Sequence, residues 1–370
     1  MEEPETRQTK TLKETDKKCP NCGATLQYDP VSGCLSCEFC GYKEEIRRDV
    51  TDSGEEKTAE ERDLFSETNT HGYDWGAKNK VVICKSCGAE SIYDELQIAD
   101  VCPYCGSTHV MQASEDVKTL APGGVVPFKV DDKKAGSLFT SWLKGKLFCP
   151  RKAKESARPE AFKGVYLPYW TYDADTQSRY TARYGIDREE KDKDGRTETK
   201  TDWYSTGGLY HELFDDVLVF GSKRYDTDLM SRIEPFDTKA NVAYSPKYLE
   251  GYTAERYSVG LKDGWTVASD KMKKVIERGI EKQVTERFHA DHVEDVKAYT
   301  KFDKTTYKYL LLPIWMSAFT YKDKIYRFVV NGQTGKVGGK SPVSAIRVIL
   351  FIAAIIAVIV GLFWLMGACK

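Results

Sequence analysis

The sequence predicts an α+β protein with two small four-cysteine ribbons, an aromatic-rich antiparallel-sheet body with two helices, and one C-terminal transmembrane helix. Three observations support this prediction: four C-x-x-C pairs near the N-terminus, helical stripes between aromatic strands in the middle, and an uncharged apolar run at the end. With 41% hydrophobic and 12% aromatic residues, the 370-residue chain can bury a sizeable core.

The first ribbon requires a choice of register. Cys19 and Cys22 form its first pair, but three further cysteines at 34, 37 and 40 compete for the second. In the later stretch, fourteen residues separate Cys87 from Cys102, and the same count from Cys22 leads to Cys37. The two stretches also share CGA after the first pair and CG after the second. We therefore read them as a duplication in which Cys34 is supernumerary.

The paired cysteines predict two metal sites. Four thiolates in a tetrahedral array suit Zn²⁺, and such a closed site is structural because it leaves no position for substrate. A glycine follows each pair and allows the tight turn of a metal-binding knuckle. The same ligands would also suit iron in a rubredoxin-like site, and a redox-active dithiol is the other alternative. The predicted ligands of the two structural zinc ions are Cys19, Cys22, Cys37, Cys40, Cys84, Cys87, Cys102 and Cys105.

The body begins with a stretch, APGGVVPFKV, that we read as a strand. An apolar stripe then predicts a helix that Asp131 or Asp132 caps and Gly145 ends. Two segments rich in Tyr, Trp, Val and Thr, Gly164–Tyr184 and Thr199–Phe220, predict a long hairpin.

The second half of the body repeats this order. A stripe from Met272 to Phe288 predicts a second helix that begins between residues 263 and 269. We expect three strands after it, Val293–Lys301, Tyr307–Tyr321 and Lys324–Val330, separated by turns at FDK and YKDK, with a further turn at NGQTGK. Both halves contain Leu-Pro-x-Trp, which suggests a duplicated unit. Because proline cannot donate to a strand ladder, we expect both prolines at a strand start or a sheet edge.

The chain ends in an apolar run, Val348–Met366, that contains no charged side chain. At about 1.5 Å per residue the run approaches the roughly 30 Å of a bilayer core, so it predicts a membrane span, with a buried or interfacial helix as the alternative. Lys336, Lys340 and Arg347 precede the run and only Lys370 follows it. The excess of basic residues places the body on the cytoplasmic side of the cell membrane, as a single-pass protein.

Two further observations agree with a cytoplasmic body. The N-terminus, MEEPETRQTK, has no apolar segment of a secretory signal, and C-x-x-C pairs are typical of thiolate metal sites in a reducing compartment. The expected divisions are a disordered lead (1–18), ribbon 1 (19–45), an acidic linker (46–80), ribbon 2 (81–111), the α+β body (112–340) and the anchor (341–370).

The motifs together resemble a family of bacterial membrane-anchored proteins with two TFIIB-type zinc ribbons. The resemblance rests on the paired ribbons, VVPFKV, GVYLPYW, LLPIW, YRFVVNGQTGKV and the C-terminal span, and it covers the chain from Cys19 to its end. It implies a place beside phage-shock-type and SPFH-domain proteins in membrane-stress operons, and a role in recruiting a cytosolic protein. Family members are often labelled primosomal helicases, but this sequence has no motor motifs.

We therefore expect a membrane-anchored adaptor with two partners, the lipid bilayer and a cytosolic protein. The resemblance implies that this protein is of the SPFH-domain or phage-shock type. The sequence offers no catalytic constellation; its nearest approach to a phosphate loop, TGKVGGKS, has Thr334 where glycine is required. The alternative is a membrane-tethered nucleic-acid binder. The balance of 55 basic and 56 acidic residues argues against it. The basic residues that keep it open are Lys17, Lys18, Lys43, Arg47, Arg48, Lys78, Lys80 and Lys85.

Overall fold

The computed structural model describes residues 18–48, 50–51, 54, 56–65, 79–84, 90–94, 110–112, 120–156, 162–191, 197–322 and 324–368. For 79–112, 320, 325 and 362–368 within these ranges, only the backbone is described. The predicted lead, apart from Lys18, therefore lies outside the described residues.

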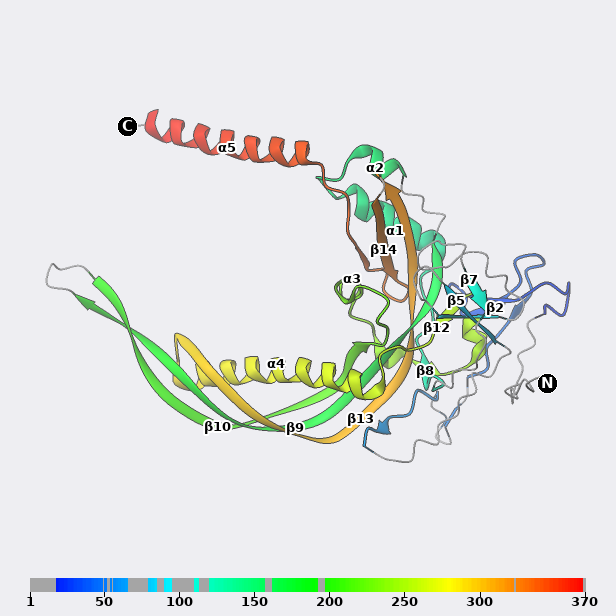
Figure 1. Cartoon of the computed structure of the whole chain (residues 1–370), viewed down its shortest axis with the longest axis horizontal. Helices are drawn as coiled ribbons and strands as arrows, with labels where there is room; N and C mark the ends of the chain where they lie inside the picture. The colour runs from blue at the N-terminus through cyan, green and yellow to red at the C-terminus, as the bar shows by residue number, and fades with distance from the viewer. Residues whose placement is uncertain are drawn as a thin grey trace, which may run out of the picture.

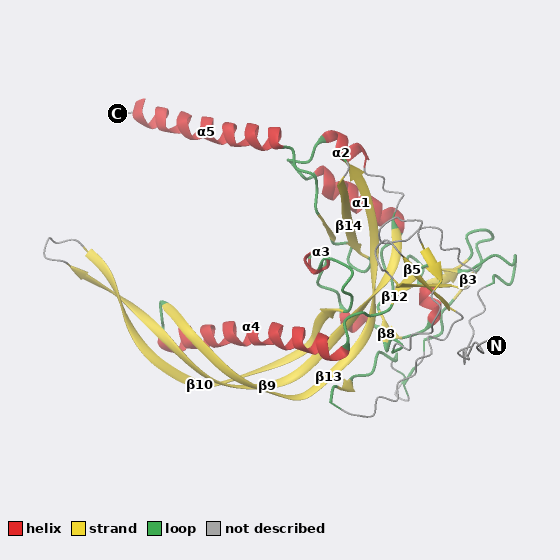
Figure 2. Ribbon diagram, in the orientation of Figure 1, coloured by secondary structure: helices red, strands yellow, loops and turns green. Residues whose placement is uncertain are grey.

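The fold is α+β and centres on two long antiparallel strands, β9 (Lys163–Lys191) and β13 (His292–Tyr321). Strand β10 (Thr197–Phe220) pairs with β9, and β14 (Lys324–Asn331) pairs with β13. The long hairpin expected from the aromatic segments is thus present. Most pairings in the described sheet are antiparallel, and two short ones, β8 with β13 and β12 with β9, are parallel (Figure 2).

Shorter elements surround these strands. The helices are α1 (Asp132–Lys144), α2 (Arg151–Ser156), α3 (Thr227–Ser231), α4 (Leu261–Phe288) and α5 (Ala345–Ala368), with 3₁₀ turns η2 (Thr238–Ala240) and η3 (Pro246–Leu249). The short strands are β1 (Gln27–Asp29), β2 (Cys34–Ser36), β3 (Lys43–Glu44), β4 (Arg62–Asp63), β5 (Asn79–Cys84), β6 (Glu90–Asp94), β7 (Val110–Gln112), β8 (Gly124–Val125), β11 (Val242–Ala243), β12 (Thr253–Glu255) and β15 (Val337–Gly339).

Beyond residue 174, β9 leaves the body with β10 and the first half of β13 as a curved three-stranded arm (Figure 1). Helix α4 lies along one face of this arm. Its buried Ile276, Ile280 and Val284 form a small core cluster of their own with Tyr180 and Ala182 of β9. Exposed side chains on the opposite face alternate with buried ones along β9 and with half-buried ones along β10, as the period of two in a strand requires.

The body is built from two similar units, β8–α1–β9–β10 and β12–α4–β13–β14. Pro313 follows Pro168 by 145 residues, and Tyr166 pairs with Pro313 as Leu311 pairs with Pro168. A shift of 145 residues therefore exchanges the two central strands. This agreement supports the duplication that the repeated Leu-Pro-x-Trp motif suggests.

The two tryptophans of the motif make equivalent contacts. The indole N–H of Trp170 donates to the carbonyl of Val259 at 2.9 Å, and that of Trp315 donates to Val130 at 2.8 Å. Each acceptor lies between the short strand and the helix of the other unit. Each tryptophan therefore ties its long strand to the β–α connection of the opposite unit.

The two prolines correct one expectation. Pro168 and Pro313 lie inside the central strands, and not at a strand start or sheet edge. On the side of β9 that faces away from β13, the partner strand is β12 as far as Tyr166 and β10 from Tyr169 onward. Pro313 lies at the matching change from β8 to β14. At these changes no ladder needs the missing N–H, so proline is tolerated.

The turn predicted at FDK was wrong. Pairing of β13 with β9 continues through this region, with a shift of register between Asp303 and Thr306, and Lys304 adopts a positive φ of 48°. A matching irregularity occurs in β10 between Phe214 and Val217, where Asp216 has a φ of 56°. Such bulges bend a strand without ending it.

Other predicted boundaries differ less. Asp131, one of the two predicted caps, caps α1: its side chain accepts a hydrogen bond from the Lys134 N–H at 2.6 Å. Gly145 ends the helix as expected. APGGVVPFKV forms only the two-residue strand β8, and α4 begins at Leu261, before the expected range. Part of the expected linker packs on the body, where β4 pairs with β13 and the Ala59 N–H donates to Asn241.

Helix α5 follows the body and extends away from it (Figure 1). Large apolar side chains along it are exposed, including four consecutive ones, Ile349–Ile352, at 47 to 64%. Among the residues that the structure describes, no helix has both the length and the apolar character required to cross a bilayer.

Candidate metal centre

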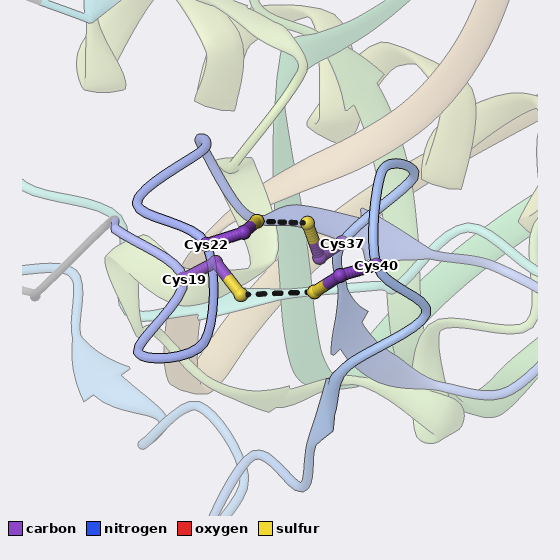
Figure 3. A group of neighbouring side chains, drawn as sticks. All are labelled: Cys19, Cys22, Cys37 and Cys40. Carbon is purple, nitrogen blue, oxygen red and sulfur yellow. Dashed lines mark hydrogen bonds between the residues drawn. The ribbon is translucent and has the colours of Figure 1, made fainter.

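The first ribbon is a small three-stranded sheet, β1–β2–β3. One turn precedes β1 and another follows β2, so both lie at the open end of the β1–β2 hairpin. Cys19 and Cys22 lie on the turn before β1, and Cys37 and Cys40 lie on the turn after β2. The two turns face each other, so the four sulfur atoms point into one space (Figure 3). The hairpin thereby brings together cysteines that are distant in sequence.

The distances suit a tetrahedral metal ion. The Sγ atoms of Cys19 and Cys40 are 3.4 Å apart, and those of Cys22 and Cys37 are 3.5 Å apart. All four sulfurs lie within 4.8 Å of one another. The two measured separations exceed the about 2.05 Å of a disulfide and are slightly shorter than the edge of about 3.8 Å that four thiolates at about 2.3 Å from a metal would have.

Both turns have the backbone of a metal-binding knuckle. The N–H of Gly23 donates to Cys19 O at 2.8 Å, and that of Gly41 donates to Cys37 O at 2.9 Å. Both glycines have a positive φ, 75° and 73°, which side chains rarely tolerate. The backbone N–H groups of Cys40 and Phe39 point at the Cys37 sulfur and lower its thiol pKa to about 7. The pKa values of Cys22 and Cys40 are instead raised, because hydrogen bonds among the sulfurs and burial outweigh the backbone N–H at each, so Cys37 is the cysteine of the cluster that most favours the thiolate.

Cys34 does not belong to this cluster. It lies in β2, and its Sγ donates to the carbonyl of Ser32 at 3.4 Å. The cluster consists of the four cysteines that the fourteen-residue spacing selects.

The ribbon packs directly on the body. The Tyr28 N–H donates to Glu250 O at 3.0 Å, and the Tyr28 ring meets the Tyr248 ring edge-on at 5.5 Å. Lys247 and Glu44 form an ion pair at 2.7 Å that is about one-third exposed. Folding of the ribbon is therefore coupled to the segment 246–252 that leads into β12.

The second predicted cluster lies largely outside the described residues. Cys84 is the last residue of β5, and Cys87, Cys102 and Cys105 fall outside. The backbone shows β5 between β6 and β7, and β6 pairs with β12 through Ile92 and Ala254. The strands of this region thus extend the main sheet.

A group of three carboxylates, Asp173, Asp215 and Asp216, also has the spacing of a metal site. Here a lysine supplies the positive charge: Lys308, which is 7% exposed, lies 2.8 Å from Asp216 Oδ1 and 3.9 Å from Asp173 Oδ2. Although burial opposes it, the ammonium and the Thr238 hydroxyl lower the pKa of Asp216. We interpret this group as an ion-pair network at the base of the arm.

One buried acid was not anticipated. Glu255 of β12 is fully buried, accepts a hydrogen bond from Ser222 Oγ at 2.6 Å and pairs with Arg224 at 3.0 Å. Burial raises its pKa to about 7 against the opposing effects of these two partners. Ser222 and Arg224 follow β10, whereas Glu255 ends β12 about thirty residues later, so no local sequence motif could have indicated the group.

A cleft of about 490 Å³ lies between the ribbon and the body. Tyr28 and Ser32 line one side, and Phe128, Lys129 and Lys239 line the other. Two of its cations are paired with carboxylates: Lys239 with Asp215 at 2.9 Å, and Arg48 with Glu56, which also lines the cleft, at 2.5 Å. We assign no reaction to this cleft.

Comparison with known proteins gives one similar sequence. YdjG, an uncharacterized protein of Bacillus subtilis (strain 168), is 29% identical over 349 residues, which cover 91% of this chain and 93% of YdjG. No family model matches the chain, and no solved structure matches it.

Proposed function

We propose that the chain is a membrane-anchored zinc-ribbon adaptor that holds a cytosolic protein at the membrane. In this proposal α5 is the anchor, zinc occupies the four-cysteine cluster and its predicted second counterpart, and the body is the docking module. The body faces the cytoplasm, and a protein of membrane-stress response is the partner class. No chemical reaction is part of the role.

The observation that carries the proposal is the exposure of α5. Consecutive residues of a helix are about 100° apart, so the exposed Ile349, Leu350, Phe351 and Ile352 together present apolar surface on nearly every side. Water disfavours such a helix, whereas lipid accommodates it. The proposed span, Val348–Met366, includes residues whose side chains lie outside those described.

Zinc is proposed because of the donor set. Four thiolates with knuckle N–H groups supply a soft, closed and tetrahedral environment, and reducing conditions keep cysteines available as ligands. A closed site cannot bind substrate, so the metal would stabilise a surface. The Lys247–Glu44 ion pair and the contact of the Tyr28 and Tyr248 rings join the ribbon to segment 246–252 and make that surface continuous with the body.

The shape of the molecule sets one requirement on insertion. In Figure 1, α5 and the arm extend from the body in the same general direction. The arm carries charged, exposed side chains at its end, including Arg188 and Lys200, which cannot enter lipid cheaply. Insertion therefore requires the direction of α5 relative to the arm to change.

The test is affinity capture of the full-length chain in mild detergent after cross-linking in cells. The control is α5 with residues 341–344 fused to an unrelated soluble domain. The adaptor role predicts cytosolic proteins that copurify with the full-length chain and not with the control. Identical partner sets would contradict docking by the body, and capture that nuclease abolishes would favour the nucleic-acid alternative.

A further inference from the structure

The loop between α1 and α2 combines a concentrated positive charge with an exposed leucine. Residues 144–154, KGKLFCPRKAK, hold five basic residues and no acidic one. Leu147 lies at the centre of this stretch and is 72% exposed. Four of its neighbours in the stretch, Phe148, Cys149, Pro150 and Ala153, are partly or fully buried, so the leucine projects from a loop that is itself well packed.

This basic loop is held beside the start of α5. The Ser344 N–H donates to Phe148 O at 2.9 Å. Arg347 donates to the carbonyls of Leu147 and Cys149 at 3.2 and 2.7 Å. Ser344 precedes α5, so its contact fixes the point at which the chain enters the helix, whichever way the helix then turns.

The cations of the loop are placed at the surface. Arg151 and Lys152 are exposed, and the Lys146 ammonium lies 4.4 Å from the centre of the Trp142 ring. An acidic side chain contacts one of them, Glu155, at 3.3 Å from Arg151, and both members of that pair are more than half exposed. Such exposed pairs are weak and open to competition by another anion.

We propose that residues 144–154 form a basic collar that binds the headgroups of anionic phospholipids where the chain enters the bilayer, with Leu147 inserted among the acyl chains. The proposal rests on α5 being the anchor. Charge complementarity favours this partner, because the cytoplasmic leaflet is negative and attracts basic residues beside a span. An apolar side chain within a basic segment is the arrangement found at membrane surfaces.

The collar is tested with the full-length chain in lipid nanodiscs, one set of phosphatidylcholine and one containing phosphatidylglycerol. Amide hydrogen exchange of residues 144–154 is the readout. We expect slower exchange in the anionic discs and loss of this protection at high salt. Each basic residue near an anionic surface strengthens binding about fivefold. The triple variant K146Q/R151Q/K152Q should therefore lower the equilibrium constant for binding of the loop to the anionic surface roughly a hundredfold.

The matched control is K129Q/K133Q/K134Q, which removes three exposed charges at the other end of α1, about 18 Å away by helix length. It should keep the protection. Equal exchange in both kinds of disc, or equal effects of the two triple variants, would overturn the collar. Protection by inorganic phosphate alone, in neutral discs, would also overturn it by showing a soluble anion site.

The anchor and the collar can fail separately. Resistance of the chain to alkaline extraction from vesicles reports insertion of α5. An inserted chain whose loop ignores lipid charge would leave the anchor in place and remove the collar. A chain that is extracted yet binds phosphatidylglycerol vesicles through the loop would keep the collar and remove the anchor.

Discussion

The two units of the body share an order of elements but differ in size. Helix α1 has 13 residues and packs on the short β13–β14 end of the sheet, where Phe139 stacks on Phe328 at 3.8 Å. Helix α4 has 28 residues and covers the long β9–β10 arm. Each helix thus covers the hairpin of the other unit. The length of each helix follows the area of sheet that it must cover, because uncovered apolar sheet is costly.

The units also differ in what they attach. The first ribbon packs on the segment before β12, and β6 adds to β12 itself, so the second unit carries the cysteine-rich regions. Val125 of β8 pairs with Leu311 as Ala254 of β12 pairs with Tyr166, so the next residues, Val126 and Glu255, occupy equivalent positions, and both are fully buried. The two units therefore differ at the short strands that flank the central pair, β8 beside β13 and β12 beside β9.

The largest expected effect comes from removing the ribbon's metal. Cys37→Ser should lose one zinc ion, and with it roughly 10 to 16 kcal/mol of binding free energy, because three thiolates no longer close the site. Exchange should then rise at 246–252 of the second unit. Metal analysis and hydrogen exchange measure both. Cys34→Ser is the control and should keep its metal; the reverse pattern would show that the ligands were assigned wrongly.

The next effect compares the two helices. Phe139→Ala should lower the free energy of unfolding by about 3 to 5 kcal/mol because Phe139 belongs to the main core. Ile280→Ala removes a buried side chain from the separate cluster of the arm, so its cost of about 2 to 5 kcal/mol should appear as local opening of the arm. Site-resolved hydrogen exchange distinguishes the two cases. Equal loss of protection throughout the body in both variants would show that the arm is no separate unit.

The buried Glu255 predicts a pH dependence that Val126 cannot produce. Its folded pKa, about 7, lies above its ordinary value of 4.5, so folding favours the protonated form. The contribution to stability is complete below pH 4.5 and falls as the pH rises through 7, by about 3 kcal/mol in total. Denaturation from pH 4.5 to 8 should show a flatter profile for Glu255→Gln. The exposed Glu189→Gln should match the original protein, and an unchanged slope in Glu255→Gln would refute the assignment.

The smallest effect tests the equivalence of the units. Trp170→Phe and Trp315→Phe each remove one indole donor from a part-buried carbonyl, which should cost about 1 to 3 kcal/mol. Urea denaturation should give similar values for both. A large difference between the two losses of stability would mean that the equivalent hydrogen bonds contribute unequally to the free energy of unfolding.

Local signals predicted local structure well. The Asp131 cap, Gly145, and the long aromatic hairpin depend on residues close in sequence, and the structure places them as expected. The four-cysteine register was also readable, because an internal repeat supplied the spacing. These signals do not depend on the rest of the fold.

Non-local pairing explains what could not be predicted. FDK has turn composition, but continued pairing of β13 with β9 turns it into a bulge. The prolines are tolerated because neighbouring strands change beside them, which only the assembled sheet reveals. The docking of the ribbon through Tyr28, and the partners of Glu255, likewise join distant segments.

The arm makes the molecule a lever. From residue 174 to its last residue, β9 spans about 60 Å at about 3.3 Å per residue. The bulges at Asp216 and Lys304 lie at the inner end of this length, beside the buried Lys308 and its carboxylates, and together they form an elbow. A load on the outer end would exert its greatest torque at this elbow. A force on the outer end of the arm would therefore strain the ion pairs of Lys308 before it reached other contacts of the core.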